Sequence, residues 1–246
     1  MNMNLKVRLR FSKLGKIRFI SHRDVARIWE RALRRAELPV AYTEGFSPRP
    51  KLSFGLALST GHESLGEYLD VDLRTDTGPP IEVDELAARL DPCLPVGLDA
   101  RGAVAIEPGT TSLQQAVTSC TWRIEVIGVG ADRLASLAGA ALAAGELPIT
   151  RSRKGREEQI DLRPAVLSAE VAGPTDWGAA LVAELATQPR SVRPSDLLAG
   201  LGSGLEEGRV CRTHQWILVD GEREEPVPPT SEPAAAPSPH AEARAS

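Results

Sequence analysis

Cysteine is scarce in this sequence of 246 residues. The three cysteines, Cys93, Cys120 and Cys211, lie far apart and are odd in number. This pattern argues against a disulfide framework, a zinc site of the CxxC type and a cysteine-ligated iron–sulfur cluster within the chain. We therefore expect a protein of the reducing cytoplasm that holds no cofactor and no metal of its own.

Long apolar runs and aromatic residues are also rare. No segment approaches the roughly 18 uncharged apolar residues of a membrane span, and the N-terminal segment lacks the apolar stretch of a signal peptide. Aromatic residues make up only 4% of the chain, so the composition gives little support to RNA recognition by base stacking. The hydrophobic fraction of 42% and the charged fraction of 25% are typical of a globular protein, so we expect no membrane partner.

The net charge of −4 conceals a strong asymmetry along the chain. Residues 1–58 contain 13 Lys and Arg against 4 Asp and Glu, a net charge of +9, so the other 188 residues carry −13. A basic segment of this kind is typical of a surface that binds polyanions. Because arginine outnumbers lysine 24 to 5 throughout the chain, the positions of the cations are more informative than their number.

The order of the predicted elements indicates an α+β fold. Ser21 is a good N-cap for a helix that Pro39 must end. A βαββαβ order is that of a ferredoxin-like unit, with helices on one face of an antiparallel sheet. The first half is predicted to contain strands over 5–11, 52–58, 67–73 and 98–106, a short extended piece over 17–20, and helices over 22–37 and 80–91.

A second unit is predicted after a linker over 107–115. We expect two tandem ferredoxin-like units, over 1–108 and 116–219. The segment 220–246 is rich in Pro, Ala and Glu, which predicts a disordered tail whose removal leaves the fold intact. The second unit is predicted to contain strands over 121–127, 149–153, 159–171 and 210–219, helices over 131–144 and 194–200, and a helix or strand over 179–187.

Cations recur on the first strand and the first helix. Lys6, Arg8 and Arg10 alternate with apolar residues, so we expect them on the sheet face that the helices leave open. A row of this kind can follow phosphates; the alternative is a solvated face or one that the second unit covers. A stripe of Arg23, Arg27, Arg31 and Arg34 lies opposite the apolar face of the helix, where the alternative is an ordinary solvated surface.

Two basic loops, each with a glycine, are candidate phosphate-binding sites. The alternative for the second loop is an exposed hairpin tip. His22 begins the first helix, where the helix dipole disfavours imidazolium, so it is a candidate neutral base or donor, or else a surface histidine. No partner for it is identifiable, and no catalytic residue is assigned. The predicted phosphate-binding residues are Lys13, Lys16, Arg18, His22, Arg49, Lys51, Arg151, Arg153, Lys154 and Arg156.

Residues 4–74 carry a specific set of motifs. They are K-x-G-x-x-R-F-I-S-H at 13–22, E-R-A-L-R-R-A at 30–36, G-F-S-P-x-P-K at 45–51 and E-Y-L-D at 67–70; R-K-G-R at 153–156, D-L-R-P at 161–164 and R-P-S-D-L-L at 193–198 follow more loosely. In these motifs the chain resembles the radical-SAM-associated domain family of unknown function, whose members occur alone or fused after a radical SAM enzyme with a B12-binding-like region. Glu37 stands where this family leads us to expect Gly, and Arg23 where Leu is common.

The resemblance implies partnership with a radical SAM protein and supplies no catalytic residue. We expect an accessory protein that is not an enzyme on its own, and that binds structured RNA such as tRNA or rRNA without DNA specificity. One alternative is a metal-independent RNA endonuclease that uses His22, because the fold plan is distantly similar to that of the CRISPR repeat-processing endonucleases. Another alternative is an adaptor that contacts only protein.

Overall fold

The computed structural model describes residues 4–76, 79–153 and 155–228. In the first half of the chain, strands and helices alternate in the predicted order. The elements are β1 (Asn4–Lys13), the 3₁₀ helix η1 (Gly15–Phe19), α1 (His22–Arg35), β2 (Leu52–Phe54), β3 (Glu63–Arg74), η2 (Val83–Glu85), α2 (Leu86–Leu90), η3 (Asp91–Cys93) and β4 (Leu98–Ala105).

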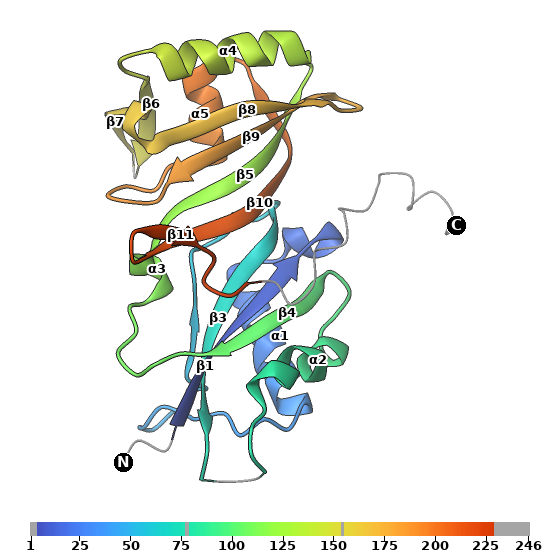
Figure 1. The fold of residues 1–246 in the computed structure, drawn as a ribbon. Coiled ribbons are helices and arrows are strands. Elements are labelled where there is room, and N and C mark those ends of the chain that lie inside the picture. The colour runs from blue at the N-terminus through green and yellow to red at the C-terminus, as the bar shows by residue number, and fades with distance from the viewer. Residues whose placement is uncertain (1–3, 77–78, 154, 229–246) are drawn as a thin grey trace, which may run out of the picture.

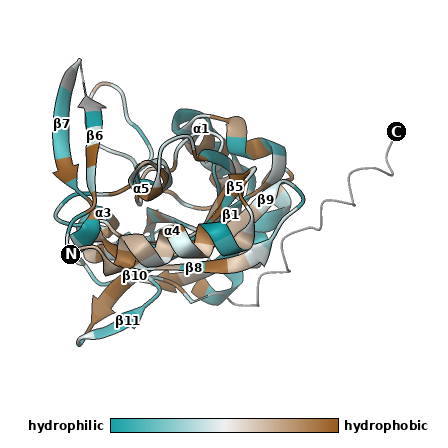
Figure 2. Ribbon diagram, turned by 90° about the horizontal axis from the view of Figure 1, so that it is seen from above, coloured by the Kyte–Doolittle hydropathy of each residue, from teal (hydrophilic) through white to brown (hydrophobic). Residues whose placement is uncertain are grey.

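The second half adds a strand hairpin that lies outside the main sheet. This hairpin, β6–β7, projects from the body of the molecule (Figure 2). The elements are α3 (Leu113–Ala116), β5 (Val117–Ile127), α4 (Ala131–Ala143), β6 (Pro148–Arg153), β7 (Arg156–Asp161), η4 (Arg163–Ala165), β8 (Val166–Pro174), β9 (Gly178–Ala186), α5 (Pro194–Leu201), β10 (Glu206–Val219) and β11 (Glu222–Glu224).

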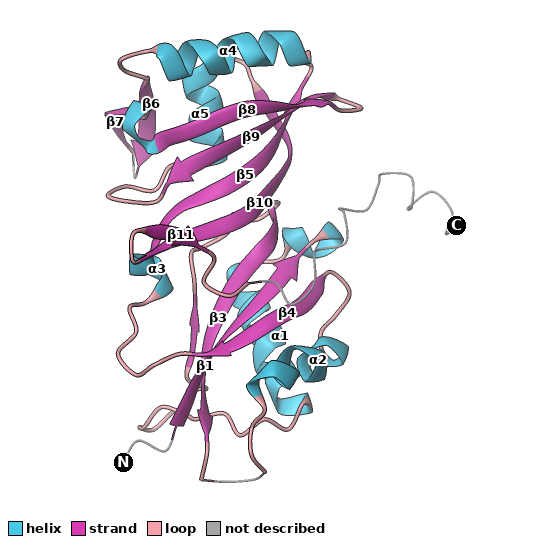
Figure 3. Cartoon of the chain, viewed as in Figure 1, coloured by secondary structure: helices cyan, strands magenta, loops and turns pink. Residues whose placement is uncertain are grey.

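Strands from both halves form one nine-stranded sheet that runs along the whole molecule (Figures 1 and 3). Its path is β4-β1-β3-β10-β5-β9-β8, with β2 paired to β3 and β11 paired to β10. All these neighbours are antiparallel except β3 and β10, which pair in parallel at Glu63–Cys211 and Ser64–Arg212. The fold is therefore a mixed α+β structure with a large sheet and few helices.

Helix α1 packs on the first half of the sheet because its apolar residues recur at helical spacing. Val25, Trp29 and Leu33 are buried against β1, and the rings of Trp29 and Phe11 lie 5.0 Å apart. The helix begins as predicted, since Ser21 Oγ accepts a hydrogen bond from the Asp24 backbone N–H at 3.2 Å.

Glu37 lies just after the C-terminal end of α1, at a position where the backbone favours glycine. Its φ of 51° is in the left-handed region, which favours glycine. The Glu37 N–H donates to Arg34 O and the Leu38 N–H donates to Leu33 O, both at 3.1 Å. These bonds close the helix in the manner of a Schellman motif, in which glycine is the usual residue.

A second apolar core lies in the other half. Leu134 and Ala138 of α4 and Leu197 and Leu198 of α5 are buried in one cluster with inward side chains of the sheet. The second core also reaches into the first half, because Tyr68 of β3 belongs to it and Leu56, Leu58 and Val104 pack against it.

Several predicted elements differ from the structure. Residues 17–20 belong largely to η1 rather than to an extended piece, and the strand predicted over 52–58 ends at Phe54. The helix predicted over 80–91 is α-helical only over Leu86–Leu90, since a separate 3₁₀ turn with Pro92 as its second residue begins at Asp91. Residues 159–171 are two strands, divided by η4 with Pro164 in its first turn.

The prediction that residues 220–246 lie outside the fold is wrong for the first part of this segment. Glu222–Glu224 form β11 on β10, and Val227 is only 1% exposed within the second core. The composition of the segment did not reveal this, because the pairing of Glu225 with Arg10 and the burial of Pro226 and Val227 depend on residues far away in the sequence. Residues 229–246 lie outside the described residues.

Candidate functional site

Arg8 and Arg10 of β1 are buried, and Lys6 is partly exposed. Arg8 Nε and Nη2 lie 2.7 and 3.0 Å from the two carboxylate oxygens of Asp70, its cross-strand neighbour. Arg10 Nη1 lies 2.6 Å from Glu225 Oε2 and 3.0 Å from Val227 O. The predicted phosphate row of Lys6, Arg8 and Arg10 is therefore wrong, because carboxylates neutralise two of the three cations and the C-terminal segment covers that face.

The first basic loop does form an anion site, and the protein's own carboxylate fills it. Glu63 Oε1 accepts from the Gly15 backbone N–H at 2.8 Å and lies 3.4 Å from Arg18 Nη1. Glu63 Oε2 lies 3.0 Å from Arg209 Nε. Glu63 is buried, so it occupies the place that the sequence suggested for a phosphate.

Lys13 is part of the protein interior. Its Nζ donates to Arg18 O at 3.2 Å and to Ile20 O at 3.3 Å. Burial lowers the pKa of this ammonium, against an opposing effect of Glu67. Lys13 therefore holds the segment 18–20 in place, and the prediction that it binds phosphate is wrong.

Three other predicted residues of the first half are exposed. Lys16, Arg49 and Lys51 all face solvent, and no ion pair joins them to another described residue. The loop between Thr43 and Arg49 is closed by backbone bonding, with Thr43 N–H donating to Arg49 O at 2.8 Å. Arg18 is partly exposed, and its guanidinium lies 4.5 Å from the centre of the Phe19 ring.

The second basic loop lies on the β6–β7 hairpin, at the far end of the molecule from residues 40–51 (Figure 1). Arg151 forms a bidentate pair with Asp196, and cross-strand register places it opposite Glu158. Arg153 and Arg156 pair in register at the end of the hairpin, and Lys154 lies outside the described residues. The cations of this hairpin therefore lie far from Arg49 and Lys51 (Figure 1).

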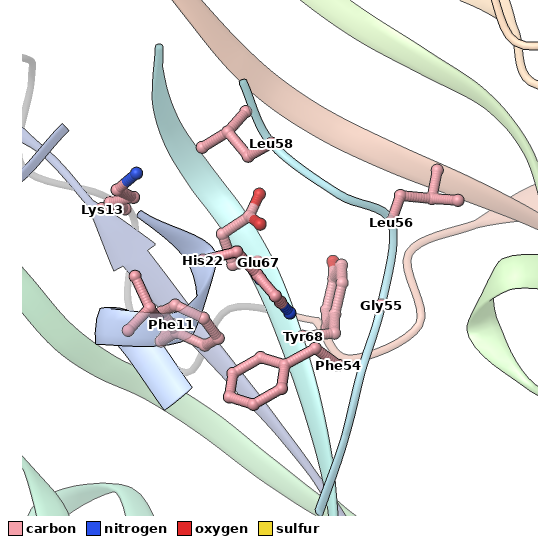
Figure 4. A pocket seen from close by; sticks show the side chains of 10 residues that line it. Phe11, Lys13, His22, Phe54, Gly55, Leu56, Leu58, Glu67 and Tyr68 are labelled. Carbon is pink, nitrogen blue, oxygen red and sulfur yellow. The ribbon is translucent and has the colours of Figure 1, made fainter. Parts of the chain in front are cut away.

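A small hollow opens beside the first turn of α1 (Figure 4). It contains about 340 Å³ of empty space, part of it open to solvent. The His22 ring contacts the Phe54 ring edge to face, with centroids 5.0 Å apart. The walls are mostly apolar, and the polar side chains are those of Lys13, His22, Glu67 and Tyr68.

A buried ion pair forms the polar wall of this hollow. Glu67 Oε1 accepts from Arg212 Nε at 3.1 Å and from Arg212 Nη2 at 2.5 Å. Arg212 is only 1% exposed and also donates to Leu56 O at 3.0 Å. The Tyr68 hydroxyl is buried without a hydrogen-bond partner among the described residues, and burial raises its pKa, so it remains neutral.

Sequence reasoning identified His22 but missed Glu67, Tyr68 and Arg212. Glu67 and Asp70 are the two acids of the E-Y-L-D motif, and the structure pairs them with Arg212 and Arg8. That motif was the available sign of their importance. Their partners lie 145 and 62 residues away in sequence, beyond the reach of any local pattern.

Among residues 4–76, 79–153 and 155–228, no cluster of His, Cys, Asp and Glu has the arrangement of a metal site, and the three cysteines are unpaired. No helix of the described chain is long and apolar enough to cross a bilayer.

The structure is thus that of an α+β protein whose buried arginines are paired with carboxylates. A small hollow with apolar and polar walls lies beside α1, and exposed basic residues surround this helix. Residues 6–194 match the family described as uncharacterized proteins conserved in bacteria, DUF2344, and the chain belongs to this family. No curated protein matches the chain.

Proposed function

We propose that this protein is an accessory protein that binds structured RNA through the outer surface of α1 and the neighbouring 43–51 loop. The observation that carries this proposal is the contrast between two sets of cations. Arg8, Arg10 and Arg212 are buried in ion pairs, whereas every basic residue of α1 is exposed.

The exposed cations of α1 have few internal partners. Only Arg27 forms an ion pair with another described residue, at 3.4 Å from the exposed Asp24. An exposed, unpaired guanidinium is available to phosphate oxygens, which it can bind in a bidentate manner. The exposed cations of the helix are Arg23, Arg27, Arg31, Arg34 and Arg35.

The segment after α1 returns along the helix and extends this surface. Arg34 lines a hollow together with Tyr42 and Pro50, and Phe54 contacts His22 at the other end of α1. The loop between these contacts carries the exposed cations Arg49 and Lys51. Phe46 lies in the same loop and is fully exposed, which adds an aromatic ring to the basic surface.

A salt titration with a matched pair of variants tests the RNA proposal. With about 4–6 phosphates contacted in single-stranded segments, log K for a labelled tRNA should fall with log salt with a slope of about −3 to −4. Arg31→Glu with Arg34→Glu should weaken binding by about 1–3 kcal/mol. Arg123→Glu with Arg133→Glu, at exposed positions of β5 and α4, makes the same change in charge and should have little effect. A flat salt response, or equal losses in both proteins, contradicts the proposal.

We further propose that the partner of this protein is a radical SAM enzyme to which it presents the RNA. Support for this part comes from the resemblance of residues 4–74 alone. Purification of the tagged chain from its native host, with and without ribonuclease, should enrich a protein with a CxxxCxxC motif. Its absence from both preparations contradicts the partnership while leaving RNA binding untouched.

We also propose that each half is a ferredoxin-like unit. Support comes from the strand order, which is β4-β1-β3-β2 in the first half and β10-β5-β9-β8 in the second. Each half runs βαββαβ in sequence if the β6–β7 hairpin is treated as an insertion. The extension of β10 beyond its own unit then joins the two sheets.

A second candidate function is metal-independent RNA cleavage, and the hollow in Figure 4 favours it. His22 would accept the proton of a 2′-hydroxyl, whose oxygen attacks the adjacent phosphorus while the 5′-oxygen leaves. This candidate ranks second because Lys13, the nearest cation of the hollow, already donates to two backbone carbonyls.

A further inference from the structure

A wide groove lies where η1 of the first half meets the β8–β9 turn of the second half. It contains about 1100 Å³ of empty space that is open to solvent. Phe19 from η1 and Trp177 from the turn both line it, and they are 60% and 71% exposed. Two large aromatic side chains from distant parts of the sequence thus face the same open space.

Exposed aromatic rings are unexpected in a chain with so few aromatic residues. Clustered exposed apolar side chains mark binding surfaces, whereas isolated ones need no explanation. The guanidinium of Arg18 lies 4.5 Å from the centre of the Phe19 ring, and Arg209 lines the groove as well. Alternating rings and guanidinium planes are the surface on which unpaired bases of RNA stack.

The groove is held in place before any ligand binds. Buried Glu63 fixes both Arg18 and Arg209, and the Gly61 N–H donates to Arg18 O at 2.8 Å. On the other wall, Trp177 O accepts from the Gly128 N–H at 2.7 Å. Because these contacts order both walls in the free protein, little conformational entropy is lost on binding.

The charges of the groove favour bases over phosphates. Glu125 accepts from the Arg209 backbone N–H at 3.1 Å, and Glu207 lies 3.8 Å from His62 Nε2. Carboxylates repel the RNA backbone but accept hydrogen bonds from the amino groups of bases. The cations that would hold phosphates lie nearby, since Phe19 precedes the basic helix α1 by only three residues.

We propose that this groove binds unpaired bases of RNA, which stack on Phe19 and Trp177. The proposal rests on the proposed RNA-binding function and narrows it to RNA with single-stranded bases. In this proposal α1 and the 43–51 loop bind the phosphates, and the groove between the two halves binds the bases.

The test compares a 12-nucleotide oligoadenylate with an abasic 12-mer of the same charge. The oligoadenylate should bind about tenfold more tightly than the abasic chain and quench tryptophan fluorescence. Trp177→Ala should remove the quenching and reduce the affinity for oligoadenylate about tenfold, whereas Trp177→Phe should keep most of the affinity. Leu167→Ala, at a 53% exposed position of β8, is the matched control and should change neither.

The possible failures are distinguishable. If both 12-mers bind equally, or if Trp177→Ala and Phe19→Ala leave oligoadenylate affinity unchanged, the stacking proposal is wrong and RNA binding by phosphate contacts stands. If neither 12-mer nor tRNA binds at low salt, both proposals fail. If Trp177→Ala abolishes only copurification of a protein partner, the groove is a protein interface. Circular dichroism shows whether each variant is folded.

Discussion

Arg10 and Glu225, which are 215 residues apart in sequence, form an ion pair with Nη1 and Oε2 separated by 2.6 Å. Arg10 lies in the first strand and is only 3% exposed, while Glu225 lies just after the last strand. The pair fastens the C-terminal segment across the face of β1 opposite α1. This contact makes the segment 220–228 part of the folded protein.

Two truncations therefore have different outcomes. Removing residues 229–246 should leave the melting temperature unchanged. Removing 220–246 should reduce the free energy of unfolding by about 2 kcal/mol or more, because it removes the buried Val227 together with the partner of Arg10. Urea unfolding followed by circular dichroism measures both.

The point variant Glu225→Ala in the full chain removes the ion pair but keeps Val227. This variant should show a large part of the loss in the free energy of unfolding. Equal stability of the 1–219 fragment and the full chain would contradict the structural role of this segment.

Glu37→Gly should stabilise the protein. The left-handed conformation at this position costs a non-glycine residue about 1 kcal/mol, and glycine removes that cost. Glu37→Ala keeps the cost and is the control. In thermal unfolding, the Glu37→Gly variant should therefore have a higher melting temperature than the native protein. The Glu37→Ala variant should show no comparable increase.

The Arg8–Asp70 pair should prove structural, not functional. Arg8→Ala should lower the free energy of unfolding by about 3–5 kcal/mol because Asp70 is left buried and unpaired. Arg8→Met with Asp70→Leu should recover most of the loss. Disrupting the exposed Arg74–Asp76 pair by Arg74→Ala should have little effect. A loss of RNA affinity in the well-folded double variant would return Arg8 to the binding surface.

The thiols should make the protein sensitive to alkali. Burial raises the pKa of Cys120 to about 11 and that of Cys211 to about 12. In the folded state both thiols keep their protons at a pH where the unfolded chain loses them, so the stability they confer is complete below about pH 9 and declines above it. Urea unfolding at pH 8 and pH 10.5 measures the decline.

The same burial predicts slow alkylation of two of the three cysteines. Thiolate is the reactive form, so buried Cys120 should react at pH 8 only after unfolding, and the partly exposed Cys211 should react slowly in the folded protein. Mass spectrometry after iodoacetamide treatment identifies the modified positions. Rapid modification of Cys120 in the folded protein would contradict its burial.

Binding and cleavage predict opposite patterns in two variants. If the protein is a binder, Lys16→Ala with Arg49→Ala should weaken RNA binding by about 1–3 kcal/mol, and His22→Ala should do little. If it is a nuclease, His22→Ala should remove about 10²–10⁴-fold of a cleavage rate measured in EDTA and leave affinity nearly unchanged. If cleavage is observed and disappears in the His22→Ala variant, RNA cleavage becomes the better-supported function.

Helix α1 was predictable because its determinants are local. The spacing of Val25, Trp29 and Leu33 defines the buried face, and Ser21 defines the start. The alternation along β1 was equally clear, and it placed Leu9 on the buried face correctly. The spacing of apolar residues and the capping of helix ends depend on a few neighbouring residues, so a single sequence is enough to identify them.

The binding surface was less predictable because charge reveals nothing about partners far along the chain. Arg8 and Lys13 have the same sequence signature as Arg49, yet two are neutralised or held inside and one is exposed. Asp70 makes the difference for Arg8, and the carbonyls of Arg18 and Ile20 make it for Lys13. The groove of Phe19 and Trp177 was invisible for the same reason, since it requires both halves of the fold.

The docking of residues 225–227 against β1 also constrains how the protein is made. A ribosome adds about 5–20 residues per second, so the first strand waits about 10–40 s after its own synthesis for Glu225. Throughout that interval the nascent first half exposes an unpaired arginine and an uncovered sheet face to the cell. The final structure of this half is completed only after residues 225–227 have been translated.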